Sequence, residues 1–252
     1  MTDETLLLIG RDTAHAREVF ETHAERLRDS GVVDTVRVVV YEDDPIRELG
    51  ETFASIAAGV VYALPLVVAH THETTSAIPT VLSSVTGDVC YCEPIGRSPA
   101  ITGVLTDRAS EQLQPDRDTS LVLVGFGNSS QPYQRQVVEY HAERIRTRTP
   151  YEEVVPSYLI QDPAVECARY NVSSEEFVAV PVFVSRNEAT ETEIPSKLEL
   201  DRGGMRYAEP LGTHHNLTDA IHAEVEKQRV LRGTSIENGT DTQRVVTDGS
   251  GN

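Results

Sequence analysis

The chain has 252 residues, of which 39 % are hydrophobic, so it can form a packed core and is too apolar for a disordered chain. Its 40 acidic residues exceed its 22 Lys and Arg, and the formal net charge of −18 repels phosphate backbones and anionic lipid surfaces. We therefore expect neither nucleic acid nor a membrane as a partner.

The composition also indicates the setting in which the protein works. Three cysteines are too few for a disulfide framework, no apolar run is long enough to cross a bilayer, and the acidic start does not resemble a signal peptide. These features predict a cytoplasmic protein. Lys197 and Lys227 are the only lysines. An acid-rich, lysine-poor composition is typical of a halophilic host, because concentrated salt screens self-repulsion; the alternative is an ordinary acidic protein.

The first half of the chain alternates strand and helix patterns. An apolar run of strand length covers residues 6–9, and apolar residues at three- and four-residue spacing follow over residues 16–27, as in an amphipathic helix. The β-branched segment 35–41 predicts a second strand. The further predictions, in order, are a helix at 46–58, a strand at 59–68, a short helix at 78–84, a strand at 88–92 and a helix at 99–113.

The second half of the chain repeats the first. Residues 6–10 (LLLIG) return as 121–125 (LVLVG), 65–68 (PLVV) as 181–184 (PVFV), and 91–96 (YCEPIG) as 207–212 (YAEPLG), at offsets of 115 or 116 residues. Matches in one order at one offset indicate a duplication. We predict repeats over 5–110 and 120–232, a polar linker between them and a disordered tail at 233–252. The second repeat predicts strands at 121–124, 153–159, 177–184 and 204–208 and helices at 131–147, 163–172 and 216–230.

The alternation of patterns predicts the fold class. Strands that are apolar throughout and alternate with amphipathic helices imply parallel sheets covered on both faces. We therefore expect an α/β protein with two tandem, doubly wound parallel-sheet lobes. In such lobes ligands bind at the carboxyl ends of the strands. The functional residues should follow Ile9, Tyr41, Val68 and Cys92 and their counterparts in the second repeat.

The order of motifs resembles that of a known family. A strand leads into a glycine loop, PLVV is followed ten residues later by Ile78-Pro79, and a Tyr-x-Glu-Pro-(Ile/Leu)-Gly element follows in each repeat. This set resembles the CbiX/SirB family of sirohydrochlorin chelatases, the class II chelatases, over both repeats. The resemblance implies two α/β lobes of the class II chelatase type. It also implies insertion of a divalent metal, usually cobalt, into a tetrapyrrole between the lobes, as in cobalamin or siroheme biosynthesis.

The chain departs from the family at the metal-binding positions. Family members carry Gly-His-Gly-Ser after the first strand, and that histidine is a metal ligand; here Arg11 and Phe126 stand at its position. The second family histidine corresponds to Glu73 in the first repeat, with His72 one residue earlier, and to Ala189 in the second repeat. Neither repeat therefore has the family's pair of histidines.

The segment His70-Thr71-His72-Glu73 retains metal-binding chemistry near the second position. If the strand continues, His70 and His72 point to one side, and with Glu73 they offer donors suited to Co²⁺, Ni²⁺ or Fe²⁺. Metal insertion also needs a base for two pyrrole N–H protons, which His72 or Glu73 can supply. We predict a metal site at His70, His72 and Glu73, with His72 and Glu73 catalytic. The alternative is a pair of polar loop histidines.

Four further residues are predicted to bind the substrate. The substrate class carries many carboxylates, which the fork of Arg11 can bind, although a surface pair with Asp12 is the alternative. Phe126 and Ser129 offer a flat ring and a hydroxyl to the opposite wall, unless they form an ordinary strand-to-helix loop. His214 offers a ligand from the second lobe, unless it belongs only to a helix N-terminus.

These observations leave two hypotheses of different classes. The first is a chelatase that takes a divalent metal as substrate, Co²⁺ before Fe²⁺ or Ni²⁺, and inserts it into sirohydrochlorin or a related tetrapyrrole. Because no nucleotide-binding motif is present, we expect no organic cofactor. The second hypothesis is a relative that binds a tetrapyrrole or a metal without turnover, which the replaced histidines favour. The sequence does not indicate the oligomeric state.

Overall fold

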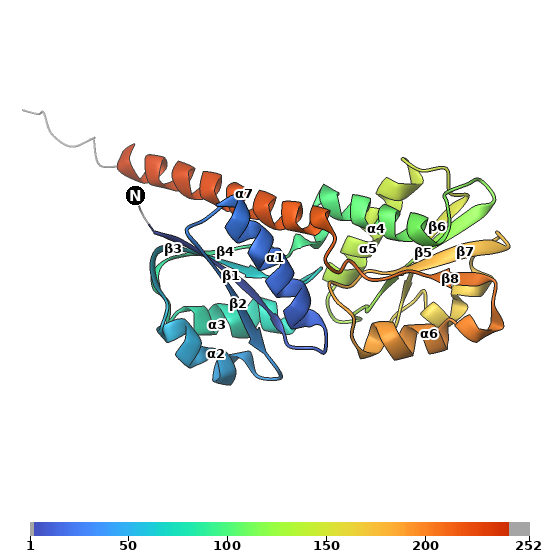
Figure 1. The fold of residues 1–252 in the computed structure, drawn as a ribbon, viewed down its shortest axis with the longest axis horizontal. Coiled ribbons are helices and arrows are strands. Elements are labelled where there is room, and N and C mark those ends of the chain that lie inside the picture. The colour runs from blue at the N-terminus through green and yellow to red at the C-terminus, as the bar shows by residue number, and fades with distance from the viewer. Residues whose placement is uncertain (1–2, 242–252) are drawn as a thin grey trace, which may run out of the picture.

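The computed structural model describes residues 3–241 and consists of two α/β lobes that lie side by side (Figure 1). Each lobe contains a four-stranded sheet in which all strands are parallel. The first sheet has the order β2-β1-β3-β4, with β1 (Glu4–Arg11), β2 (Thr35–Tyr41), β3 (Ala57–Pro65) and β4 (Thr86–Tyr91). The second has the order β6-β5-β7-β8, with β5 (Thr119–Gly125), β6 (Glu153–Tyr158), β7 (Glu176–Pro181) and β8 (Met205–Tyr207). This architecture confirms the predicted fold class.

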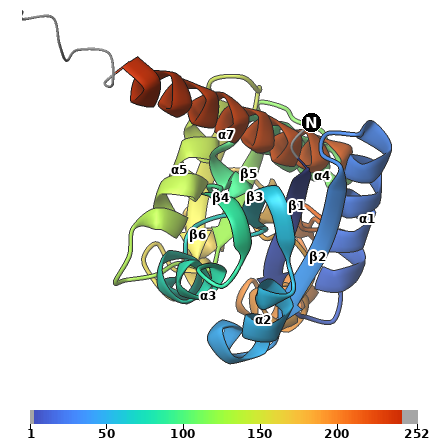
Figure 2. The ribbon, with the colours of Figure 1, turned by 90° about the vertical axis from the view of Figure 1, so that its left-hand side faces the viewer.

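Helices cover both faces of each sheet, as the amphipathic patterns require. They are α1 (Ala16–Ser30), α2 (Pro45–Ala54), α3 (Ile78–Leu82), α4 (Pro99–Gln112), α5 (Tyr133–Arg146), α6 (Ile194–Lys197) and α7 (His215–Asp241). Figure 2 shows the first sheet end-on, with α1 and α7 on one face and α2 and α3 on the other. A turn of π-helix precedes α3 (Glu73–Ala77) and another precedes α6 (Ala189–Glu193).

Two predicted elements in the second repeat and tail differ from the structure. Segment 163–172, predicted as a helix, forms only a short 3₁₀ turn (Val165–Tyr170), in which Val165 and Ala168 alone are buried. The tail predicted to be disordered from residue 233 is helical up to Asp241, because no proline interrupts α7 and Gly233 costs a helix only about 1 kcal/mol. The rest of that predicted tail lies outside the described residues. None of the helices within 3–241 is both long and apolar enough to cross a bilayer.

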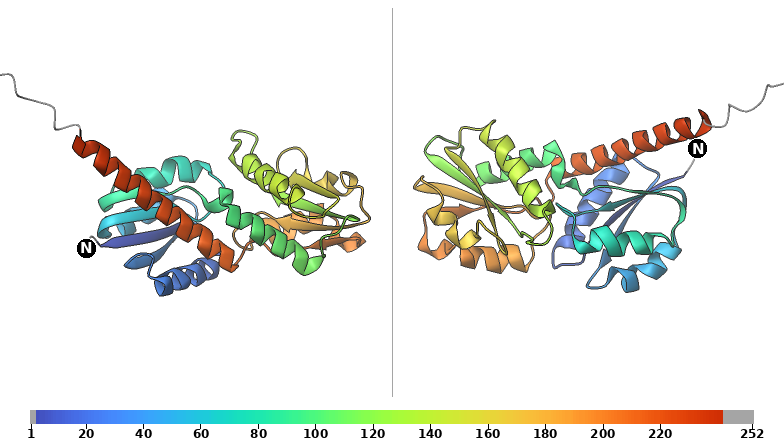
Figure 3. Two further views of the ribbon diagram at one scale, coloured as in Figure 1. Left: turned by 90° about the horizontal axis from the view of Figure 1, so that it is seen from above. Right: turned by 180° about the vertical axis from the view of Figure 1, so that it is seen from behind.

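The last helix of each repeat packs against the other lobe. α4 ends the first repeat and contacts β7 and α5 of the second lobe, whereas α7 ends the second repeat and contacts α1 and β3 of the first. Figures 1 and 3 show α4 lying over the second lobe and α7 lying along the first. Each lobe therefore includes a helix from the other repeat.

One hydrophobic core continues through the seam between the lobes. It contains Leu6 and Leu8 from the first sheet, Leu121 and Leu123 from the second, and buried residues of α1, α4, α5 and α7. The opposite faces have separate cores, under α2 and α3 in the first lobe and under α6 in the second. Because burial of apolar surface is the main stabilising contribution to folding, the shared core holds the two lobes together.

Two buried histidines also join the lobes. His23 on α1 contacts the carbonyl oxygen of Gly212 through Nε2 at 3.0 Å and the hydroxyl of Thr218 on α7 through Nδ1 at 2.8 Å. Its side chain is 0 % exposed. A neutral imidazole satisfies both contacts when Nε2–H donates to the carbonyl and Nδ1 accepts from the hydroxyl.

His141 on α5 makes the reciprocal contacts in the other direction. Its Nε2 contacts the carbonyl oxygen of Gly96, its Nδ1 lies 2.9 Å from the hydroxyl of Thr102 on α4, and its side chain is 0 % exposed. The duplication has thus produced the same cross-lobe contact twice. We refer to these six residues as the histidine clasp: His23, Gly212 and Thr218 with His141, Gly96 and Thr102.

Candidate functional site

The carboxyl ends of β1, β3 and β7 meet at the seam and border a central cleft of about 200 Å³. Its lining comes from both lobes and includes residues related by the duplication, such as Thr71 with Asn187 and Val68 with Val184. This is the edge at which parallel sheets bind ligands. The cleft therefore lies where the sequence predicted the functional residues.

Arg11 ends β1 and lines this cleft, as predicted. Its guanidinium donates to the Oδ1 atom of Asp43 at 2.6 Å and to the carbonyl oxygen of Glu42 at 2.7 Å. The alternative prediction, a surface pair of Arg11 with Asp12, is wrong, because Asp12 accepts a hydrogen bond from Arg17 instead. The Arg11 side chain is 59 % exposed and that of Asp43 85 %, so the pair contributes little stability and an incoming carboxylate can compete for Arg11.

Glu73 lies near Arg11 and Tyr41 at the same edge. Burial raises the pKa of Tyr41 to about 12, the Glu73 carboxylate adds to this shift, and the Arg11 charge opposes it. Burial also acts to raise the pKa of Glu73, but the Thr71 hydroxyl, the backbone N–H of Glu73 and the charges of His72 and Arg11 together lower it. The Glu73 carboxylate is therefore ionised at neutral pH. The sequence did not single out Tyr41, although it ends a strand at this edge.

The predicted geometry of His70 and His72 is wrong. β3 ends at Pro65, and His72 adopts helical backbone angles at the start of the π-turn, so the alternation of a continuing strand does not apply. His72 is exposed, whereas His70 is only 20 % exposed and bonds elsewhere. Within residues 3–241, no three His, Cys, Asp or Glu side chains are placed to hold a metal. The structure therefore does not bring His70, His72 and Glu73 together as a preformed metal site.

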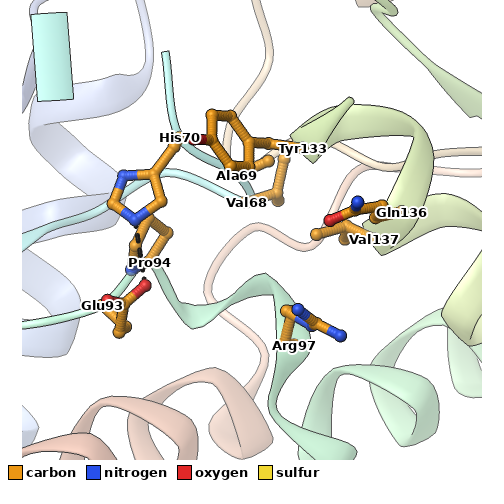
Figure 4. Close-up of a pocket in the computed structure, with 9 residues that line it drawn as sticks. All are labelled: Val68, Ala69, His70, Glu93, Pro94, Arg97, Tyr133, Gln136 and Val137. Carbon is orange, nitrogen blue, oxygen red and sulfur yellow. Dashed lines mark hydrogen bonds and ion pairs between the residues drawn. The ribbon is translucent and has the colours of Figure 1, made fainter. Parts of the chain in front are cut away.

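His70 lies instead in a second cavity, of about 130 Å³, which we call the seam pocket (Figure 4). Its Nε2 is 2.9 Å from the Oε2 of Glu93, its Nδ1 is 3.1 Å from the Thr74 hydroxyl, and its ring packs edge-on against Tyr133 of α5. Nine residues line the seam pocket: Val68, Ala69, His70, Glu93, Pro94, Arg97, Tyr133, Gln136 and Val137.

The duplication places an ion pair at the position equivalent to His70 and Glu93. Arg186 lies 116 residues after His70, and its Nε and Nη2 each donate to the Glu209 carboxylate at 2.7 Å. Glu93 and Glu209 belong to the Glu-Pro-(Ile/Leu)-Gly elements. The sequence analysis identified this motif but not the basic residue that pairs with its glutamate, His70 or Arg186. Aligning the two repeats places His70 opposite Arg186, and this alignment is the signal that could have identified the pair.

The remaining predicted site residues lie apart from the seam pocket. Phe126 is 39 % exposed after β5 and Ser129 is exposed; in the described part of the chain neither lines the central cleft. His214 is only 11 % exposed, forms an ion pair with Asp107 of α4 at 3.3 Å, and stacks on His215. Burial and then the His215 charge lower the pKa of His214, and Asp107 opposes this. His214 is therefore not brought together with His70 or Arg11.

Comparison with known proteins agrees with this architecture. The family model of CbiX matches residues 5–112 and again residues 120–228. The chain belongs to the CbiX family. A probable sirohydrochlorin cobaltochelatase of Halobacterium salinarum is 25 % identical over 222 residues, which cover 76 % of this chain and 75 % of that protein.

Solved structures show the same fold. SirB from Bacillus subtilis, solved with Fe³⁺, matches with a TM-score of 0.73 at 16 % identity, over 90 % of this chain and 95 % of SirB. DR2241 from Deinococcus radiodurans, a multi-domain protein with structural similarity to chelatases, matches with a TM-score of 0.70 at 19 % identity over 88 % of this chain. The chain spans 55 % of the length of DR2241.

Proposed function

We propose that this protein is a chelatase that inserts a divalent metal, cobalt before iron or nickel, into sirohydrochlorin or a related tetrapyrrole. The observation that carries the proposal is the pair Arg11 and Glu73. These residues stand at the two positions where the family has histidines. Arg11 lines the central cleft, and Glu73 lies close enough for the Arg11 charge to help lower its pKa. A cation and an ionised carboxylate there match a macrocycle with acidic side chains and a metal cation.

Arg11 is the proposed anchor for a macrocycle carboxylate. It already holds the Asp43 carboxylate through one Nη2 contact, in a geometry that a substrate carboxylate can reproduce. Asp43 is exposed and free to move aside. Exchange of one carboxylate for another costs little electrostatic energy because both stay in contact with water.

Glu73 and His72 divide the two tasks of metal insertion between them. The lowered pKa of Glu73 keeps its carboxylate charged, which suits it to hold a cation more than to accept a proton. His72 is exposed, and the unprotonated ring nitrogen of a neutral imidazole can accept a proton from a pyrrole nitrogen. With only one or two protein donors the metal is held weakly, as release into the macrocycle requires.

The preference for cobalt rests on the relative from Halobacterium salinarum, a probable sirohydrochlorin cobaltochelatase. SirB was solved with Fe³⁺. Mixed carboxylate and imidazole donors do not select strongly among Co²⁺, Fe²⁺ and Ni²⁺ beyond the general affinity order. Availability of the metal would therefore decide which one is inserted.

One observation favours a second candidate function, a relative that binds a tetrapyrrole without turnover. The Arg11–Asp43 ion pair occupies the position of the first family histidine, and within residues 3–241 no three-ligand metal cluster is formed. In that case the cleft would hold the macrocycle through Arg11, and Glu73 would have no metal to bind.

The test is insertion of Co²⁺ into sirohydrochlorin, followed by the change in the visible absorption spectrum in a high-salt buffer. We expect the protein to accelerate insertion and Glu73→Gln to slow it by about tenfold to a hundredfold, because the neutral amide no longer attracts the cation. Glu188→Gln is the matched control, because Glu188 is an acidic residue of the equivalent loop in the second repeat. A spectral shift on binding without acceleration of insertion establishes the second candidate. No effect of Glu73→Gln on a catalysed rate refutes the site.

A further inference from the structure

Arg97 is a cation of the seam that stays without a charged partner. It lines the seam pocket and also a neighbouring cavity that includes Lys227 and Glu224. Within the described part of the chain its guanidinium makes no hydrogen bond or ion pair, whereas Lys227 is paired with Glu224 at 2.9 Å. In a chain with a net charge of −18, an unpaired guanidinium that borders a cavity attracts anions.

The rest of the seam pocket suits a short carboxylate arm. Figure 4 shows Arg97 across the pocket from the His70–Glu93 pair, beneath Gln136 and Val137. The Glu93 carboxylate is held by His70 at 2.9 Å on the far side of the pocket from Arg97. Gln136 offers an amide donor, and apolar residues on the pocket wall can contact methylene groups.

The two repeats differ in this arrangement. In the second repeat the guanidinium of Arg186 is neutralised by both oxygens of Glu209, and Thr213 stands 116 residues after Arg97. The first repeat has a histidine beside the glutamate and an arginine at residue 97. Within residues 3–241, the equivalent cavity of the second repeat has two arginines, Arg108 and Arg186, and both are paired with glutamates.

We propose that the seam pocket is a subsite for one carboxylate arm of the tetrapyrrole and that Arg97 binds this carboxylate. Val68 and Ala69 line both the seam pocket and the central cleft, so a macrocycle in the cleft lies directly beside the pocket. The pocket volume of about 130 Å³ holds several water molecules, and an acetate or propionate arm would displace them. This inference rests on the proposed function and makes Arg97 a substrate-positioning residue.

The first test measures binding of metal-free sirohydrochlorin by absorption titration in the high-salt buffer. We expect Arg97→Gln to weaken binding about tenfold, the loss of one charged hydrogen bond. Arg186→Gln is the matched control and should leave binding unchanged, because within residues 3–241 Arg186 lines neither the seam pocket nor the central cleft and both of its bonding nitrogens are held by Glu209. The methyl ester of the tetrapyrrole has no carboxylates and should bind Arg97→Gln and the unmodified protein equally. Equal binding of the acid form to both proteins overturns the proposal.

The second test does not depend on tetrapyrrole binding. Propionate is titrated while the imidazole C–H signals of His70 are followed by NMR, with assignment from a His70→Gln spectrum. We expect a saturable shift in the unmodified protein and in Arg186→Gln but not in Arg97→Gln. If propionate saturates this site and sirohydrochlorin does not bind, the subsite stands and the proposed function fails. If the propionate shift is the same in Arg97→Gln, or does not occur, the subsite is refuted whatever the tetrapyrrole does.

Discussion

Mild acid should weaken the seam between the lobes through the histidine clasp. Burial lowers the pKa of His23 to about 4; the hydrogen bond with the Gly212 carbonyl opposes this shift, and the charge of Arg26 adds to it. Both hydrogen bonds of the clasp histidine can be made by the neutral ring. The folded protein therefore binds a proton at His23 more weakly than the unfolded chain does.

The same holds for His141, whose pKa burial lowers to about 4, with the Gly96 carbonyl opposing the shift and Arg144 adding to it. A histidine in an unfolded chain titrates near pH 6.5. Between that pH and about pH 4, the unfolded chain therefore binds protons at these two histidines, whereas the folded chain does not. Stability should fall as the pH drops from 6.5 and stop falling through these groups near pH 4. Linkage gives a loss of about 2 kcal/mol per histidine between pH 7 and pH 5, or about 4 kcal/mol for both.

The assay is urea denaturation at constant salt, at pH 7, 6 and 5, with the free energy of unfolding taken from each curve. The unmodified protein should lose about 4 kcal/mol over this range, a large share of the usual stability of a domain. The double variant His23→Gln/His141→Gln should be less stable at pH 7 but much less sensitive to pH. His222→Gln is the matched control, because His222 is 47 % exposed and should leave the pH dependence unchanged. A double variant with the same pH dependence as the unmodified protein would refute the clasp as its source.

Three further substitutions separate structural from functional roles. Gly96→Ala should destabilise the protein by about 2 to 4 kcal/mol in thermal denaturation, because an added Cβ would lie 1.7 Å from the carbonyl oxygen of Val68. Gly233→Ala should stabilise the protein by up to about 1 kcal/mol, because nothing lies within 4 Å of an added Cβ there. Equal effects of the two substitutions would contradict the close approach of Gly96 to Val68. Arg11→Ala should change the free energy of unfolding by less than about 0.5 kcal/mol, because the Arg11–Asp43 pair is exposed. Arg11→Ala should still weaken sirohydrochlorin binding several-fold. A lower free energy of unfolding with unchanged binding would instead show that Arg11 has a purely structural role.

Local patterns in the sequence were sufficient for the order of the strands and of most helices, but not for segment 163–172, which forms a 3₁₀ turn and not the predicted helix. The β-branched segment 35–41 forms β2 with the predicted bounds, and the apolar run at 6–9 lies inside β1. The internal duplication and the position of Arg11 at the cleft followed in the same way, because the end of a parallel strand locates the ligand-binding edge. Alternation failed after Pro65, where the chain leaves the sheet and no periodicity marks the start of the π-turn.

The sequence by itself determined the fold class, the two repeats and the sheet edge that borders the central cleft, since these depend on hydrophobic periodicity within each segment. Periodicity shows which face of an element is buried but not which surface covers it. Only the tertiary structure decided that α4 and α7 pack on the opposite lobes, that Arg11 pairs with Asp43, and that His70 pairs with Glu93. Arg11 and Asp43 are 32 residues apart, and His70 and Glu93 are 23 apart. Within the clasp, His23 bonds residues 189 and 195 positions away, and His141 bonds residues 45 and 39 positions away. Packing of the whole chain is therefore needed to bring these partners together.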